Sequence, residues 1–382
     1  MKIVHFFYRD THVSLANAES SSEMKISKAT KRYENWLGKR VLLVKPDLDL
    51  KHKLMAEDSF SFMRATYYRW TQVWEKLCPD LAKAPSVLAV GDLHVENFGT
   101  WRDGEARLVW GVNDFDEAYQ MPYTNDLIRL AVSANLAVAS GHLKLTSAGI
   151  SKAILDGYVS CLKSGGRPFV LEEQHNWLRT IASGELRNPE HFWNKMDEMP
   201  TVKGVPKSAR RALQSLLPKK DLDYRVAHRV AGIGSLGHER FVALADWQGA
   251  RIAREAKALT PSACVWAYAQ KSSKRILYPE ILETACRAQD PFVRVRGRWL
   301  VRRLAPDCSR IELTDLPDKV DEKRLLESMG FETANIHFGS GKAMKAVSKD
   351  VANRRGGWLH KATKVMIDSV VADYEDWRKG HS

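Results

Sequence analysis

The chain has 382 residues, of which 44% are apolar, so it can bury one large core or two moderate ones. Its 59 Lys and Arg residues outnumber its 46 Asp and Glu residues; the net charge of +13 favours an anionic partner such as a nucleotide, a nucleic acid or a phosphorylated substrate. The five scattered cysteines form no CxxC pair, which argues against a disulfide framework or a zinc site. No run approaches the roughly 20 apolar residues of a membrane span, and the N-terminal apolar run is too short for a signal peptide, so we expect a soluble cytoplasmic protein.

The first half of the chain predicts helices around two short strands. Residues 59–77 combine aromatic side chains with helical spacing, which predicts a helix that ends before Pro79 and packs into the core. The apolar run 86–90 predicts a buried strand that delivers Asp92 to a loop. Further elements follow: a strand over 107–112, helices over 125–140 and 147–163, helical pieces to about residue 216, and surface connections within 165–225.

The loops after these two strands carry side chains with an informative spacing. Asp92 is followed five positions later by Asn97, and Asp114 comes after the second strand. Phosphoryl transfer of the protein-kinase type needs a carboxylate that orients or deprotonates the acceptor, and an Asn and an Asp that hold magnesium ions against the phosphates of ATP. We therefore assign Asp92 as the catalytic carboxylate, and Asn97 and Asp114 as Mg²⁺ ligands. Asp116 is either a ligand of a second metal ion or a solvated side chain.

Other polar residues have supporting or open roles. His94 is a structural or acceptor-side group rather than a metal ligand, because Mg²⁺ prefers oxygen. Asp126, at the start of a predicted helix, caps that helix or braces the catalytic loop. Glu280 and Glu283 are candidates for pairing with a phosphate-binding cation, with a solvated helix face as the alternative for both.

The second half of the chain predicts a hairpin built around a glycine turn. A strand over 226–231 leads into the turn, and strands over 240–245 and 250–257 follow it. Because a strand rather than a helix follows the G-x-G-x-x-G pattern, the turn resembles the glycine-rich loop that covers ATP phosphates in kinases more than a dinucleotide fold. The residues assigned to phosphate binding in this turn are Gly232, Gly234, Ser235 and Gly237.

The third strand of this region ends in basic residues. Arg254 and Lys257 are both candidates for a catalytic role and for the cation that holds the α- and β-phosphates. Strand alternation puts the two on opposite faces unless the strand ends or bulges there. A guanidinium is not equivalent to an ammonium in this position, and we prefer Lys257. Either side chain can instead be a solvated surface charge.

The order of these motifs along the chain is unusual for a kinase. Ordinary kinases carry the glycine loop and its lysine before the catalytic loop, whereas Asp92 and Asp114 precede Gly232 and Lys257 here. A circular permutation explains this order, and we predict an α+β, two-lobed, protein-kinase-like fold that is circularly permuted. A strand over 299–304, followed by residues 311–313, and a helix over 322–338 complete it. The predicted parts are an N-terminal helical segment (1–85), a catalytic-loop and helical large lobe (86–222), a β-rich nucleotide-binding small lobe (223–320) and C-terminal helices that return to the large lobe (321–382).

The same residues carry a family resemblance. Three runs resemble the motifs of the bacterial family named domain of unknown function 2252 (DUF2252): GDLHVENFG at 91–99, NDFDE at 113–117 and AGIGSLG at 231–237, together with Arg240. The resemblance extends from about residue 62 to the C-terminal helix. It implies a protein-kinase-like fold similar to aminoglycoside and choline phosphotransferases, with an ATP site, and leaves the substrate open. Where that family tends to have Lys-Glu-Ala, this chain has Arg254-Glu255-Ala256, followed by Lys257.

Three functions are compatible with these patterns. The first is an ATP- and Mg²⁺-dependent phosphotransferase that acts on an unidentified hydroxyl-bearing acceptor, a small molecule or a protein. The second is a non-catalytic nucleotide- or nucleic-acid-binding protein, which the charge of +13 and the twelve tryptophans favour. The third is a metallophosphoesterase, whose opening G-D-x-H pattern starts at Gly91 but whose later G-D-x-x-D and G-N-H patterns are missing. A kinase-like site requires the glycine turn to lie beside Asp92 and Asp114.

Overall fold

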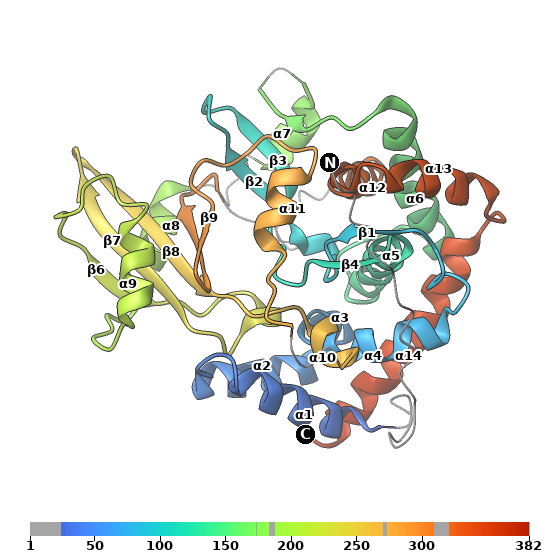
Figure 1. Cartoon of the computed structure of the whole chain (residues 1–382), viewed down its shortest axis with the longest axis horizontal. Coiled ribbons are helices and arrows are strands. Elements are labelled where there is room, and N and C mark those ends of the chain that lie inside the picture. The colour runs from blue at the N-terminus through green and yellow to red at the C-terminus, as the bar shows by residue number, and fades with distance from the viewer. Residues whose placement is uncertain (1–23, 173, 183–187, 270–272, 309–320, 382) are drawn as a thin grey trace, which may run out of the picture.

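The computed structural model describes residues 24–172, 174–182, 188–269, 273–308 and 321–381, which form a mixed α+β fold. Figure 1 shows a five-stranded sheet on the left side of the molecule and most of the helices on the right. A continuous apolar core includes buried side chains of both regions, such as Trp74, Ile128 and Phe241. The predicted segment 311–313 lies outside the described residues, as do residues 1–23 of the predicted N-terminal part. No helix among the described residues is both long enough and apolar enough to cross a membrane.

The five-stranded sheet is antiparallel and comes from the second half of the chain. Its strands, in spatial order, are β6 (Arg225–His228), β7 (Arg240–Trp247), β8 (Ala250–Ala258), β10 (Trp299–Leu304) and β9 (Arg294–Arg296). A two-residue turn at Gln248 and Gly249, both with positive φ, joins β7 to β8. The four strands predicted in this region are therefore confirmed, although β6 ends three residues earlier than expected.

Two helices cover opposite faces of this sheet. They are α8 (Pro189–Asp197) and α9 (Lys207–Gln214). On one face, Met196 of α8 packs with Val242 and Ala253 in a small apolar cluster. On the other face, Ser208 of α9 accepts a hydrogen bond from Trp299 Nε1 at 3.1 Å. The region predicted to contain surface connections thus also supplies both helices that cover the sheet.

The remaining described helices are α1 (Ile26–Gly38), α2 (Lys45–Glu57), α3 (Ser59–Ala65), α4 (Tyr67–Leu77), α5 (Thr124–Ala139), α6 (Ser147–Ser164), α7 (Asn176–Ala182), α10 (Ala263–Ala267), α11 (Tyr278–Thr284), α12 (Glu322–His337), α13 (Ala343–Asn353) and α14 (Trp358–Lys379). The helices predicted over 125–140, 147–163 and 322–338 correspond to α5, α6 and α12 and are confirmed.

The single helix predicted over 59–77 is wrong in one respect, because it is broken at Thr66 into α3 and α4. Thr66 has φ −121° and ψ 36°, and its hydroxyl donates a hydrogen bond to the carbonyl oxygen of Phe62 at 2.7 Å. Such local bonds from a threonine side chain to the backbone compete with the regular helical pattern. The aromatic side chains of this segment, including Tyr67, Trp70 and Trp74, are buried in the core as predicted.

Two small sheets carry the loops that hold the polar motifs. β1 (Ser86–Ala89) pairs with β4 (Tyr119–Pro122), while β3 (Leu108–Val112) pairs with both β2 (Phe98–Arg102) and β5 (Phe169–Val170). The strands predicted over 86–90 and 107–112 are thus confirmed. Because β2 and β3 are antiparallel, the residue before β2 meets the residue after β3. Asn113 N accordingly donates a hydrogen bond to the carbonyl oxygen of Asn97 at 2.9 Å, which brings the two loops together.

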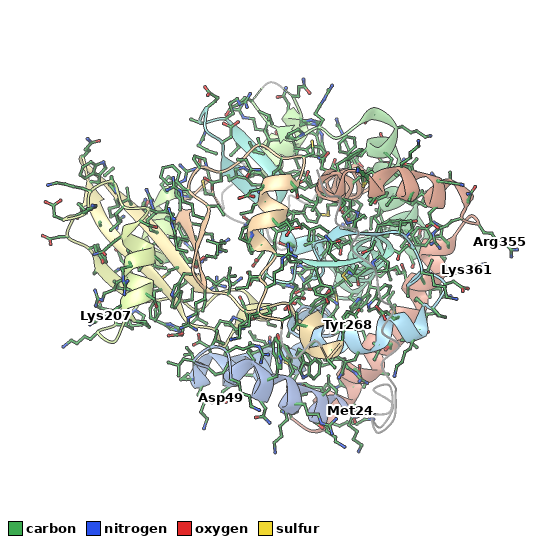
Figure 2. The ribbon with its side chains drawn as sticks, in the orientation of Figure 1. Met24, Asp49, Lys207, Tyr268, Arg355 and Lys361 are labelled. Atoms are coloured by element: carbon green, nitrogen blue, oxygen red, sulfur yellow. The ribbon has the colours of Figure 1, made fainter. Side chains whose placement is uncertain are left out.

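Exposed basic side chains lie on distant parts of the surface. Lys207, at the start of α9, is exposed and points outward at the sheet end of the molecule (Figure 2). Arg355 and Lys361, near the start of α14, are exposed and point outward at the helical end. These three cations therefore belong to no common basic patch.

Helices α6 and α12 pack unusually closely because each presents a glycine to the backbone of the other. A Cβ atom at Gly157 of α6 would lie 1.8 Å from the carbonyl oxygen of Glu327. A Cβ atom at Gly330 of α12 would lie 2.0 Å from the carbonyl oxygen of Ile154. Real Cβ atoms do not approach backbone atoms this closely, so the contact requires glycine on both sides.

We predict that Gly330→Ala destabilises the protein by about 3 kcal/mol, because the added methyl group forces α6 and α12 apart in a packed core. The free energy of unfolding from a urea titration measures this effect. Gly104→Ala is the matched control, since no atom lies within 4 Å of a Cβ at that position. A change of less than about 0.5 kcal/mol for Gly330→Ala would contradict the close helix contact.

Candidate functional site

Asp126 fixes the start of the Asp92 loop. Its fully buried carboxylate accepts hydrogen bonds from Val90 N at 2.7 Å and Gly91 N at 3.0 Å. Asp126 Oδ2 also lies 3.0 Å from Nε2 of His337 on α12. Gly91 has φ +81°, and the space beside its Cα is closed by backbone, so the turn requires glycine. The bracing role predicted for Asp126 is therefore confirmed.

Asn97 holds the Asp92 loop and the Asp114 loop together. Its side-chain Nδ2 donates hydrogen bonds to the carbonyl oxygens of Asp92 at 3.3 Å and Asp114 at 3.0 Å. Its Oδ1 accepts a hydrogen bond from Asp114 N at 2.9 Å. One of the two lone pairs of Oδ1 is therefore used by the backbone, and a metal ligand role for Asn97 depends on the other.

Asp92 is oriented by a buried arginine. Arg129 of α5 donates from Nε at 2.8 Å and from Nη2 at 2.6 Å, and both bonds go to Asp92 Oδ1. The Arg129 side chain is 1% exposed, whereas that of Asp92 is 19% exposed and borders a cavity. Burial raises the pKa of Asp92, although the nearby Arg129 acts in the opposite direction. The carboxylate is thus held in one orientation and has a raised affinity for a proton.

Lys257 of β8 connects the five-stranded sheet to the Asp114 loop. Its Nζ lies 2.7 Å from Asp114 Oδ2 and also forms an ion pair with Asp116 Oδ2. The Lys257 side chain is 1% exposed, so its charge depends on these two carboxylates for compensation. Of the two predicted cations, Lys257 is the one that the structure brings to the acidic loop.

The two carboxylates beside Lys257 have opposite pKa shifts. Burial by itself raises the pKa of Asp114, but the charge of Lys257 and a hydrogen bond with Asp116 hold that pKa well below its usual range. Burial and the charge of Asp114 raise the pKa of Asp116 to about 7. Near neutral pH the two carboxylates therefore bind and release one proton jointly, and Asp116 is the one that holds it. This behaviour is typical of carboxylates that share a small polar site.

The glycine turn lies directly beside Asp92. Gly232 and Gly237 adopt positive φ values of 74° and 94° on either side of a short 3-10 turn, Ile233–Ser235. A Cβ atom at Gly234 would lie 3.6 Å from Asp92 Oδ2, the oxygen that Arg129 does not contact. The turn thus lies next to Asp92, although about 140 positions of sequence separate them.

Helix α2 holds this turn from the other side. Lys51 Nζ donates a hydrogen bond to the carbonyl oxygen of Gly234 at 3.0 Å. Val44 N, immediately before α2, donates to the carbonyl oxygen of Gly237 at 2.8 Å. Two backbone carbonyl groups of the turn are therefore anchored to the N-terminal helices, so the turn has a defined position relative to Asp92.

A cavity of about 800 Å³ lies between the glycine turn and the two acidic loops. The two acidic loops line it with Asp92, Asn97, Asp114 and Asp116. The sheet and its glycine turn line it with Gly232, Gly234, Ser235, Arg240 and Arg302. All three predicted metal ligands and three of the four glycine-turn residues predicted to bind phosphate therefore line one space. The fourth, Gly237, lies at the end of the turn against Leu48 of α2.

The structure does not bring Arg254 to this cavity. Arg254 lies on the opposite face of β8 from Lys257, as strand alternation requires. Its Nε donates to the carbonyl oxygen of Leu216 at 3.0 Å, and its guanidinium lies 4.9 Å from the ring centre of Phe292. We therefore leave Arg254 out of the candidate site. Glu280 is also elsewhere, since it pairs with Arg275.

The sequence patterns assigned no role to several charged residues in or next to the cavity wall. Arg129 lies in a largely apolar helix, and a buried arginine needs an acidic partner, so its position in the sequence indicates such a pair. Glu255 lies two positions before Lys257 on the same strand, and alternation therefore places it on the same sheet face. Lys51 has no comparable signal, because nothing distinguishes it in the sequence from the other lysines of α2.

The acidic pair fits a magnesium ion bound together with phosphates. The described residues contain no group of three or more His, Cys, Asp and Glu side chains arranged around a common metal position. Mg²⁺, however, is commonly held by one or two carboxylates while phosphate oxygens and water complete its shell. Asp116 Oδ1 is buried and has no hydrogen-bond partner, and Asp114 lies beside it. A buried carboxylate oxygen without a hydrogen-bond partner can instead coordinate a divalent cation.

Glu332 supports the Asp114 loop from α12. Its Oε1 accepts a hydrogen bond from Val112 N at 3.2 Å, and its Oε2 accepts one from Asn335 Nδ2 at 2.8 Å. Burial raises the pKa of Glu332 to about 7, although Asn335 and Arg287 act in the opposite direction. The folded protein therefore binds a proton here more tightly than the unfolded chain does.

We predict that this contribution to stability is fully present below about pH 4.3, the ordinary pKa of glutamate, and is lost as the pH rises through 7. Glu332→Gln cannot titrate. The free energy of unfolding of the wild type, relative to Glu332→Gln, should therefore fall by about 2 kcal/mol between pH 5.5 and pH 8.5. Urea titrations of both proteins at the two pH values measure this difference. An equal difference at both pH values would contradict the raised pKa.

Comparison with known proteins finds a family match over the part of the chain that contains the Asp92 and Asp114 loops. Residues 43–221 match the family described as "Uncharacterized protein conserved in bacteria (DUF2252)". No curated protein and no solved structure matches the chain. The matched stretch contains Asp92, Asn97 and Asp114 and ends before the glycine turn and Lys257. Over residues 43–221, which contain the motifs at 91–99 and 113–117, the chain is therefore similar to this family, whereas the motif at 231–237 lies outside the matched stretch.

Proposed function

We propose that this protein is an ATP- and Mg²⁺-dependent phosphotransferase with a circularly permuted, two-lobed, protein-kinase-like fold. The observation that carries this proposal is the meeting of two distant motifs at one cavity. Asp92 and Asp114 come from the first third of the chain, and the glycine turn and Lys257 come from the sheet. Protein kinases use this same combination of parts.

The connection of the strands supports the kinase-like fold. In protein kinases the glycine-rich loop covers the phosphates and the lysine lies on the third strand of its sheet. Here the glycine turn joins β6 to β7, and Lys257 lies on β8, the third strand of this sheet in chain order. The catalytic-loop residues precede this sheet in the sequence, which the proposed permutation accounts for.

Each residue has a role in the proposed reaction. Asp92 accepts the proton of the acceptor hydroxyl as the hydroxyl oxygen forms a bond to the γ-phosphorus of ATP. The bond between the γ-phosphorus and the oxygen that bridges to the β-phosphate breaks, and ADP leaves with that bond's electron pair. Arg129 keeps Asp92 in the orientation for proton transfer. Lys257 supplies positive charge to the phosphates when a nucleotide separates it from Asp114.

Asp114 and Asp116 are the residues proposed to hold Mg²⁺, with Asn97 adding the second lone pair of its Oδ1. A bound magnesium ion neutralises charge on the β- and γ-phosphates during transfer. If Asp114 and Asp116 held a metal ion, its charge would take the place of the Lys257 ammonium beside them. Lys257 would then be available to the phosphates of the nucleotide.

We predict that Asp114→Asn weakens ATP binding about 10- to 100-fold in the presence of Mg²⁺, because the loss of a charge-assisted interaction costs about 1.5–3 kcal/mol. Isothermal titration calorimetry with a non-hydrolysable ATP analogue measures the change, with and without EDTA. Asp156→Asn is the matched control, since Asp156 is an exposed aspartate of α6 that pairs with Lys152. Equal affinities in wild type and Asp114→Asn, with Mg²⁺ present, would refute the metal assignment.

We also predict that Asp92→Asn lowers ATP turnover by about 100-fold or more, the usual contribution of a general base, while ATP affinity changes little. Chromatography of the ADP and pyrophosphate released from Mg·ATP measures turnover and separates phosphoryl transfer, which releases ADP, from nucleotidyl transfer, which releases pyrophosphate. If the wild type binds Mg·ATP but releases neither product, the protein is a non-catalytic nucleotide binder. If pyrophosphate is the product, the reaction is nucleotidyl transfer and the phosphotransferase proposal fails.

A further inference from the structure

A buried glutamate on β8 gathers three arginines at the wall of the cavity. The Glu255 side chain is completely buried, and both its oxygens are engaged. Arg302 Nε lies 2.6 Å from Oε2, and Arg240 Nη1 lies 3.3 Å from Oε1. Arg229 Nη1 lies 2.5 Å from the same Oε1. All three guanidinium groups line the cavity, and Glu255 thus positions them on one side of it.

This cluster has more positive charge than its glutamate can balance. Burial by itself raises the pKa of Glu255, but Arg302, Arg240 and Arg229 outweigh burial and hold that pKa well below its usual range. Burial lowers the pKa of Arg229, Glu255 acts in the opposite direction, and the charges of Arg240 and Arg302 lower that pKa further. A single carboxylate therefore pairs with three partly buried cations. Binding of an additional anion next to them is favourable because it compensates the remaining positive charge.

The cluster extends from the glycine turn toward the acidic loop. Arg240 Nη2 donates a hydrogen bond to Ser235 Oγ in the turn at 2.7 Å. Arg302, on the neighbouring strand β10, lines the same cavity as Asp114. The arginines therefore share one cavity with the turn that would cover phosphates and with the carboxylates that would hold their metal ion.

The position of Glu255 also argues for an anionic ligand on this part of the sheet. Glu255 lies two residues before Lys257, where the kinase signature V-A-I-K has a small apolar alanine. Alternation places both side chains on the same face of β8. Apolar and aromatic side chains usually form the walls that receive a ligand's flat, uncharged part. The planar guanidinium group of an arginine instead offers several N–H donors to the acceptor oxygens of a phosphate group.

We propose that Arg229, Arg240 and Arg302, positioned by Glu255, bind the phosphate chain of a nucleoside triphosphate. This inference rests on the proposed function, because it assigns the nucleotide's phosphates to the same cavity. It adds residues that the kinase motifs do not include and makes the number of phosphates the main determinant of affinity. Nucleoside triphosphates accordingly bind more tightly than diphosphates, and monophosphates bind weakly.

Inorganic tripolyphosphate is the probe for this site, because it contains the phosphate chain without a nucleoside. Calorimetry of the full-length protein in EDTA measures its binding without a divalent cation. We expect wild type to bind tripolyphosphate, a non-hydrolysable ATP analogue to compete with it, and Arg302→Gln to lose at least about tenfold in affinity, equivalent to the loss of one charge-assisted hydrogen bond.

Arg303→Gln is the matched control. Arg303 follows Arg302 on β10 and has a similar side-chain exposure, 20% against 17%, but it lies on the opposite sheet face near Asp290. Both substitutions change the net charge equally. An equal loss of tripolyphosphate affinity in the two variants would mean general attraction to a basic protein and would overturn the proposal.

Two further outcomes are decisive. If wild type does not bind tripolyphosphate in EDTA, or binds it without competition from the ATP analogue, the arginines are not the nucleotide's phosphate site. If Arg302→Gln fails to fold, as judged by its thermal unfolding transition, Arg229→Gln replaces it, because Arg229 is the most exposed of the three at 22%. The proposed function is tested separately by the Mg²⁺-dependent effect of Asp114→Asn, so either idea can fail alone.

Discussion

The ion pair of Lys257 with Asp114 and Asp116 is the interaction on which the arrangement of the site depends. Lys257 comes from the middle strand of the five-stranded sheet. The carboxylates lie in the loop after β3, a strand of a separate small sheet. A lysine that is 1% exposed cannot leave its charge uncompensated without a large cost in free energy. The pair therefore fixes the sheet against the acidic loops, and the glycine turn on the adjacent strands is brought over Asp92.

The order of the chain matters little to this geometry, because the two halves of the site contribute through side chains rather than through a continuous segment. Asn97 joins the Asp92 loop to the Asp114 loop, and Asp126 with Glu332 fixes both from the helices beneath. On the sheet side, Lys51 anchors the turn. These contacts can form whichever half of the site comes first in the chain, so the proposed permutation is compatible with them.

Local patterns predicted much of this architecture, and contacts between distant residues account for what they missed. Alternating strands, the glycine turn and the placement of Lys257 and Arg254 on opposite faces follow from spacing along one segment. The break at Thr66, where the backbone N–H bonds to the carbonyl oxygen of Met63 instead of Phe62, lies within an otherwise helical pattern of side chains. Arg129 pairs with Asp92, and three arginines pair with Glu255, only because distant elements pack together. The packing of distant elements cannot be read directly from a single sequence.

The distribution of charge favours a metal–nucleotide complex over the other ligands considered. Recessed arginines on the sheet attract anions, and the carboxylates of Asp114 and Asp116 across the cavity attract a cation. A nucleoside triphosphate with Mg²⁺ would satisfy both walls at once, because its phosphates would meet the arginines and its metal ion would meet the carboxylates. A nucleic acid backbone is matched less well, since its phosphates are read by exposed basic surfaces and these guanidinium groups lie largely inside a cavity.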